Sequence, residues 1–207
     1  MHRVLITRVN ATEGREAWLD LRRRHLTATD WPQITGSSRW GSEEDVIFDK
    51  LNPVTDDNGQ PTLSMQVGTG LEPFVVDSCK REHGSGEYLA QAFLSRNILG
   101  FTPDMIRITP GSDWEITEIK VSVKDWGGYV PPGYLDQVRF QATVLGVDHV
   151  RVVHLKLQSL KEGFDLIKTG RVSHNRLAIY RVDVPEAERK RIERQAIRWW
   201  KDNVEDA

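Results

Sequence analysis

The sequence contains one cysteine and no long hydrophobic run, and each absence excludes a class of protein. Cys79 alone rules out an intrachain disulfide framework, a four-cysteine zinc site and a cysteine-ligated iron–sulfur cluster. No stretch approaches the ~18 apolar residues of a membrane span. The first residues, MHRVLITRVN, lack the apolar core of a signal peptide. We therefore expect a soluble, cytoplasmic protein.

An excess of charge of either sign is also absent. The 28 Lys and Arg nearly balance the 30 Asp and Glu, giving a formal net charge of -2. Any surface for nucleic acid must therefore be a local basic patch. There is no Gly-rich phosphate loop, internal repeat or low-complexity tract. The 207 residues, 39% of them hydrophobic, predict one globular domain with a substantial core.

The spacing of apolar residues predicts an α/β fold in which a mixed central sheet is flanked by helices. We expect a helical part over about 12–85, a sheet over about 86–183 and a last helix over about 185–204. A loop is predicted at Asn52–Thr62, and a helix ended by glycine at Gly133–Gly146. Alternating or β-branched runs predict strands at 88–95, 101–109, 114–123, 149–158, 164–170 and 176–184.

Charged residues interrupt the predicted strands in GFTPDMIRITPGSDWEITEIKVSV, from Gly100 to Val123. A hairpin with a five-residue loop pairs position 104 with 118, and 106 with 116. Asp104 then lies opposite Glu118, roughly 5 Å away, and Lys120 shares their face. Asp113 lies five residues from Glu118, about 16 Å along the strand, and a turn role suffices for it. Asp104 is therefore the partner of Glu118.

Two carboxylates at that separation can share one hard cation such as Mg²⁺ or Mn²⁺. The cation polarises a phosphate and lowers the pKa of a bound water, and a nearby lysine can orient that water. The alternative is a surface salt bridge between Glu118 and Lys120. Placement of the charges in apolar strands favours phosphodiester hydrolysis.

The order Pro103-Asp104 followed by Glu118-Ile119-Lys120 resembles the motif of the PD-(D/E)xK nuclease superfamily. The surrounding segments resemble the YqaJ-type viral recombinase family, the group of phage λ exonuclease, over about residues 18 to 203. The segments that carry this resemblance are LRRRHLTATDWPQITGSSRW, VGTGLEPFVVDSC, GYLDQVRFQATVLG and RQAIRWWKDNV.

The resemblance implies a restriction-endonuclease-like core and a set of metal ligands. Asp104 and Glu118 would bind two divalent ions, together with the backbone carbonyl of Ile119 and a helix carboxylate that matches Glu72. Glu72 could instead be an ordinary helix-surface glutamate. Lys120 would be catalytic.

The resemblance also implies an active-site glutamine, which matches Gln137. The family's second glutamine position is Arg139 here, and Gln141, one helical turn after Gln137, is a candidate substitute. Met105 replaces the glycine that commonly follows the motif aspartate.

Contacts to DNA and to a 5′-phosphate are implied at the N-terminal part of the chain. Arg22 matches the family's arginine by spacing, and Thr29 stands where serine is usual. Arg23 and Arg24 leave the choice of arginine open, and a solvated basic helix end is the alternative for each of the three. Arg24 and Arg139 are further candidates for contact with DNA.

The resemblance thus implies a Mg²⁺-dependent exonuclease that degrades duplex DNA from 5′ to 3′ and leaves 3′ single-stranded tails for phage-type recombination. It implies a single-strand annealing protein as partner, a homo-oligomer with three copies, and a phage or prophage origin in a bacterial host. An endonuclease on the same core and a catalytically silent DNA-binding module are the alternatives.

Overall fold

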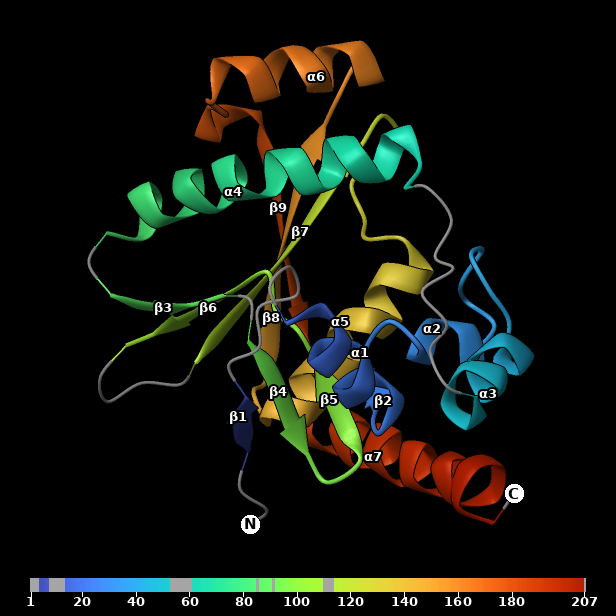
Figure 1. The fold of residues 1–207 in the computed structure, drawn as a ribbon. Helices are drawn as coiled ribbons and strands as arrows, with labels where there is room; N and C mark the ends of the chain where they lie inside the picture. The colour runs from blue at the N-terminus through green and yellow to red at the C-terminus, as the bar shows by residue number, and fades with distance from the viewer. Residues whose placement is uncertain are drawn as a thin grey trace.

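The computed structural model describes residues 4–7, 14–52, 61–84, 86–90, 92–109 and 114–206 (Figure 1). Most of the predicted Asn52–Thr62 loop lies outside these residues, and so does the turn at 110–113 that contains Asp113. No helix in the described ranges is long and apolar enough to cross a membrane.

The chain order has mainly helices first, then a run of strands, and then strands and helices in turn, as expected for a mixed α/β fold. The helices are α1 (Arg15–Arg23), α2 (Trp31–Ile34), α3 (Glu43–Leu51), α4 (Leu63–His83), α5 (Pro132–Leu145), α6 (Leu160–Thr169) and α7 (Glu186–Trp200). The strands are β1 (Leu5–Thr7), β2 (Leu26–Thr27), β3 (Glu87–Leu89), β4 (Phe93–Arg96), β5 (Leu99–Phe101), β6 (Met105–Ile108), β7 (Glu115–Ser122), β8 (His149–Lys156) and β9 (Leu177–Asp183).

The strands form two sheets where the sequence pattern predicted one. The larger sheet has the order β3-β6-β7-β8-β9, with β7 and β8 parallel and the other neighbours antiparallel. The smaller sheet has the order β1-β4-β5-β2. The connection from β7 to β8 runs through α5, as parallel neighbours require a crossover.

Two apolar layers enclose the larger sheet. One lies on the side of α4 and α6 and includes Leu71, Ile119 and Leu155. The other lies on the side of α5 and α7 and includes Ile116 and Phe140. Figure 1 shows α4 and α6 stacked beyond one side of the strands, with α5 and α7 on the other. Strands β7 and β8 therefore carry buried apolar residues on both of their faces.

Local signals in the sequence account for several elements. Ser42 and Asp45 form a capping box at the start of α3. Gly146 ends α5 in the left-handed conformation, with φ of 83°, as predicted. Helix α4 begins after Thr62, whose side chain accepts a hydrogen bond from the Met65 amide, and lies in the part predicted to be helical.

Three predictions are wrong. Residues 164–170 belong to helix α6, because Ser159 caps its start and Gly170 ends it in the left-handed conformation. The predicted strand 88–95 is divided between β3 and β4, which lie in different sheets. The part predicted to be helical, about 12–85, also contains strand β2, which pairs in parallel with β5, and strand β1 before it pairs with β4.

Candidate active site

The hairpin of β6 and β7 has the predicted register. Ile106 pairs with Ile116, and Met105 pairs with Thr117. Both isoleucines are fully buried in the layer beneath α5. Asp104 directly precedes β6, and Glu118 lies on β7 one position beyond the last paired residue. The pairing therefore brings these two carboxyl groups to the same end of the hairpin.

Glu118 is buried and accepts three hydrogen bonds from protein side chains. Its Oε1 accepts from Lys120 Nζ and from Gln137 Nε2, each at 2.6 Å. Its Oε2 accepts from Gln141 Nε2, also at 2.6 Å. Glu118 is 2% exposed, so the three donors replace the water that the charged group loses. Helix α5 supplies both amides because residues four apart share a helix face.

Asp104 is fixed by the backbone of the opposite strand. Its Oδ2 accepts from the Ile119 amide at 2.6 Å. Its pKa is raised well above the ordinary value, first because burial disfavours the charged form and then because Glu118 is negative. The hydrogen bond from Ile119 and the charge of Lys120 oppose this rise without cancelling it.

Glu72 of α4 belongs to the same electrostatic cluster. Burial raises its pKa, and the negative charge of Glu118 raises it further, while Lys120 acts in the opposite direction. Glu72 is half-buried. Three carboxyl groups from α4, the start of β6 and β7 therefore act on one another, and Lys120 offsets only part of their charge.

Lys120 keeps its positive charge in this setting. Burial by itself would lower its pKa, but the charges of Glu118 and Asp104 outweigh that effect and the pKa is raised. Its Nζ lies 4.9 Å from the ring centre of Tyr134. The ring of Trp126 lies 5.4 Å from that of Tyr134 and stacks on His154 at 3.8 Å. The Tyr134 ring thus lies beside the lysine, and Trp126 packs against that ring.

The carboxyl groups do not form a ready metal cage. Among the described residues, no group of three or more His, Cys, Asp or Glu side chains is arranged to hold a metal ion. The hydrogen bonds give a reason, because protein donors occupy both oxygens of Glu118 and Oδ2 of Asp104. Oxygen ligands and excess negative charge nevertheless suit a hard divalent cation, and a carboxylate oxygen can accept a second partner.

A second cluster of polar side chains lies between the end of α1 and the segment that follows β2. Arg22 donates from Nη2 to Thr29 Oγ1 at 2.8 Å, and its guanidinium lies 4.8 Å from the ring centre of Trp18. Trp18 in turn donates from Nε1 to Thr102 Oγ1 at 3.1 Å. Thr102 is two residues before Asp104, so this bond connects the arginine group to the segment that carries the carboxylate. The structure therefore brings together the predicted pair Arg22 and Thr29.

The other predicted basic residues have acidic partners. Arg23 and Arg24 both pair with Asp20, at 3.2 and 2.8 Å. Arg139 lies 3.5 Å from Glu188 of α7 and 3.9 Å from Asp136. It does not take the place of a glutamine at Glu118. Gln141 occupies that place.

Two features were not found from the sequence. The bond between Trp18 and Thr102 joins residues 84 positions apart, and nothing in the sequence pattern signals it. The buried ion pair of Lys50 and Asp30, at 2.6 Å, also joins separate elements. The spacing of Gln137 and Gln141, by contrast, is a signal that a helix would place both on one face.

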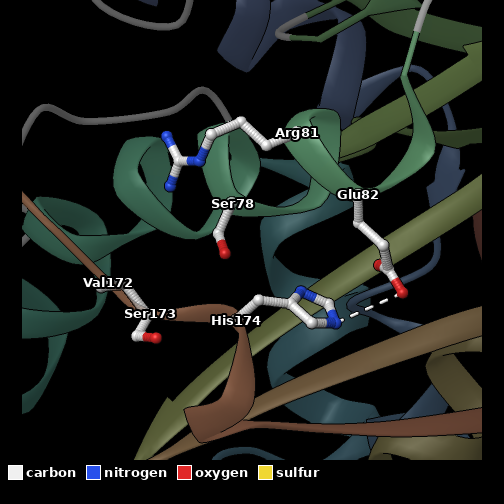
Figure 2. Close-up of a pocket in the computed structure, with 6 residues that line it drawn as sticks. All are labelled: Ser78, Arg81, Glu82, Val172, Ser173 and His174. Atoms are coloured by element: carbon white, nitrogen blue, oxygen red, sulfur yellow. Dashed lines mark ion pairs between the residues drawn. The ribbon is translucent and has the colours of Figure 1, made fainter.

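A pocket of ≈ 440 Å³ lies elsewhere, beside the C-terminal end of α4. Figure 2 shows that residues of α4 and of the segment after α6 line it, with an ion pair between Glu82 and His174. The lining residues are Ser78, Arg81, Glu82, Val172, Ser173 and His174. None of them belongs to the cluster around Glu118.

Comparison with known proteins identifies a family and several similar solved structures. A family model described as the YqaJ-like viral recombinase domain matches residues 17–148. No curated protein matches the chain. An alkaline exonuclease from Laribacter hongkongensis, LHK-Exo, has a similar structure, with a TM-score of 0.67 and 17% identity over 92% of this chain and 93% of that chain.

The crystal structure of LHK-Exo in complex with dAMP gives a TM-score of 0.68 and 18% identity over the same shares of the two chains. A phage related exonuclease from Haemophilus somnus 129PT gives 0.54 and 12% identity over 91% of this chain and 99% of that chain. These likenesses show the fold, a mixed α/β architecture with sheets flanked by helices.

Proposed function

Since this chain belongs to the YqaJ-like viral recombinase family, we propose that it is a metal-dependent deoxyribonuclease acting from the 5′ ends of duplex DNA. The observation that carries the proposal is the buried Glu118, which is held by Lys120, Gln137 and Gln141 beside Asp104. A structural salt bridge needs neither two buried amides nor a second carboxyl whose pKa is raised by the first. The proteins with similar solved structures, from Laribacter hongkongensis and Haemophilus somnus, are described as exonucleases, which supports the same activity.

Asp104, Glu118, Glu72 and the carbonyl of Ile119 would hold the metal, with Mg²⁺ as the expected ion, Mn²⁺ as a substitute and two ions per site. When bound, such a cation polarises the phosphate and lowers the pKa of a water molecule. Burial and, after it, the negative charge of Glu118 raise the pKa of Asp104 and of Glu72, and this uncompensated negative charge favours a cation here.

The protein's own groups have separate roles in this proposal. Gln137 and Gln141 fix the orientation of Glu118. Lys120 retains its proton and its positive charge, so it would orient the attacking water and offset phosphate charge. Asp104 is held by the Ile119 amide at a fixed position across the hairpin. Such fixed positions matter because misplacement by about 1 Å can reduce a rate about 100-fold.

Action at 5′ ends follows from Arg22 and Thr29. A guanidinium and a hydroxyl in contact at 2.8 Å provide donors suited to a terminal phosphate. The proposal is supported by Trp18, which lies against Arg22 and donates a hydrogen bond to Thr102, two residues before Asp104. A phosphate bound there would leave the next phosphodiester bonds of that strand close to the carboxyl cluster.

The products of the proposed reaction are 3′ single-stranded tails, which a single-strand annealing protein would use in recombination. We further propose a homo-oligomer, with a trimer as the expected form, and action in the cytoplasm of a bacterial host. The whole chain would act as one nuclease domain. Arg24 and Arg139 remain candidates for weaker contacts with DNA. Each would have to leave its acidic partner, Asp20 or Glu188, to bind a phosphate.

The test is digestion of linear duplex DNA that carries a label at one defined end, with Mg²⁺ present. We expect stepwise release of nucleotides from 5′ ends, no cleavage of covalently closed circular DNA, and loss of activity in Asp104→Ala. The matched control is Asp165→Ala, which removes an exposed carboxyl on α6 and should be as active as the parent. Cleavage of closed circles would favour an endonuclease, and a fully active Asp104→Ala variant would remove Asp104 from the site.

A further inference from the structure

A buried ion pair lies directly beneath the pair of Arg22 and Thr29. Lys50 Nζ lies 2.6 Å from Asp30 Oδ2, and the two side chains are only 4% and 10% exposed. Lys50 comes from the last turn of α3, and Asp30 comes from the segment between β2 and α2. Burial lowers the pKa of Lys50 even though the charge of Asp30 opposes that effect. The charged form of Lys50 is therefore disfavoured at this position.

The two charged groups each contact a different half of the proposed phosphate site. Lys50 Nζ also donates to the backbone carbonyl of Arg22 at 2.8 Å. Asp30 Oδ2 also accepts from the Thr27 amide at 2.8 Å. The Thr27 hydroxyl then lies 3.0 Å from the Thr29 hydroxyl, which accepts from Arg22. One ion pair thus joins the end of α1 to the turn that presents Thr29.

A buried ion pair is seldom needed for stability alone. Its desolvation penalty offsets most of its attraction, and apolar residues of similar volume often serve as well or better. Geometric specificity is the better-attested use of such a pair. Here the polar contacts of the pair end at the backbone of Arg22 and of Thr27, whereas the side chains of Arg22 and Thr29 point to a more exposed surface.

We propose that Lys50 and Asp30 are positioning residues that set the spacing of Arg22 and Thr29 for a terminal 5′-phosphate. This inference rests on the proposed function, because it takes the Arg22 and Thr29 pair as the phosphate site. Lys50 and Asp30 do not touch the phosphate. They fix the two backbone segments from which the contacting groups extend.

The test compares kcat/KM on the same linear duplex with 5′-phosphoryl and with 5′-hydroxyl ends. The first variant is Lys50→Met with Asp30→Asn, which leaves no buried charge and keeps an acceptor for the Thr27 amide. We expect its preference for the 5′-phosphoryl end to fall about tenfold, with the rate on 5′-hydroxyl ends unchanged. Asp49→Asn removes an exposed charge beside Lys50 on α3 and should keep the parental preference.

Should thermal melting show that this variant does not fold, Lys50→Gln with Asp30→Asn replaces the ion pair with two amides. The glutamine side chain is one atom shorter than that of lysine, so it should not reach the Arg22 carbonyl. The same loss of preference for the 5′-phosphoryl end is expected. An equal fall in both rates would indicate a general structural role and would overturn the inference, as would an unchanged preference.

Arg22→Ala separates this inference from the proposed function. If Arg22→Ala abolishes the preference and the Lys50 and Asp30 variants retain it, only the positioning role fails. If the parent shows no preference for phosphoryl ends, the proposed phosphate site fails and the positioning role fails with it.

Discussion

Replacing Gln141 with leucine tests whether the amides of α5 hold the central carboxylate. Gln141 is 1% exposed, and its Nε2 donates to Glu118 Oε2 at 2.6 Å. Its Oε1 is buried without a hydrogen-bond partner among the described residues. Loss of a hydrogen bond to a charged group destabilises by ~1.5–3 kcal/mol, and removal of the unpaired oxygen returns about 1 kcal/mol. We expect a net destabilisation of about 0.5–2 kcal/mol.

Gln141→Leu should also slow the cleavage of DNA. Without Gln141, Oε2 of Glu118 loses its protein donor, while Oε1 keeps Lys120 and Gln137. The carboxylate can then rotate, and displacement of a reacting group by about 1 Å reduces rates about 100-fold. We expect single-turnover digestion of duplex DNA to slow about 10- to 100-fold. Gln137→Leu should have the smaller effect, because Lys120 still donates to the same oxygen.

Two measurements on the same preparation check this reasoning. The midpoint of thermal unfolding should fall by about 1–8 °C, since 1 kcal/mol corresponds to about 2–4 °C in a chain of this size. Gln195→Leu, on the exposed face of α7, is the matched control and should change neither quantity. A Gln141→Leu variant that digests DNA at the parental rate would show that the buried amide does not position Glu118.

Three further predictions concern other contacts. Burial lowers the pKa of His154 from 6.5 to about 4, so the fold favours the neutral ring. The free energy of unfolding should therefore decrease by about 3 kcal/mol as pH falls from about 6.5 to about 4. Denaturant titrations should show this decrease, and His154→Phe should reduce it. A side chain at Gly163 would approach Val67 within 2.4 Å, so Gly163→Val should destabilise by ~1–3 kcal/mol in the same titrations. Trp18→Phe removes the hydrogen bond to Thr102. We expect kcat on 5′-phosphoryl ends to fall while metal binding is unchanged. An equal kcat for variant and parent would argue against a link from Arg22 through Trp18 to the segment of Asp104.

Strong local signals predicted part of the fold correctly. The apolar alternation of β6 and β7 sets which residues face the core, so the pairing of Ile106 with Ile116 could be worked out from spacing and a turn. Gly146 and the Ser42 capping box fix helix ends through contacts within a few residues. The same local rules predicted that Gln137 and Gln141 share a helix face.

Long-range contacts account for what the sequence could not predict. The segment 164–170 contains Phe164, Leu166 and Ile167 in a short apolar run, which is compatible with a strand until the cap at Ser159 and the packing on α4 are known. The division of 88–95 between two sheets depends on partners far along the chain. At the site, donors from α5 surround Glu118, and the Lys50 and Asp30 pair joins elements that the sequence does not relate.

The most direct test of the site is a titration of Mn²⁺ binding, followed by the electron paramagnetic resonance signal of the free ion. The parent should bind Mn²⁺, and Asp104→Asn and Glu118→Gln should each weaken that binding at least about tenfold, because each removes one charged ligand. Asp165→Asn, which removes an exposed carboxyl, should bind as the parent does. Equal affinity of all four proteins, measured on folded samples, would show that Asp104 and Glu118 do not hold a shared cation.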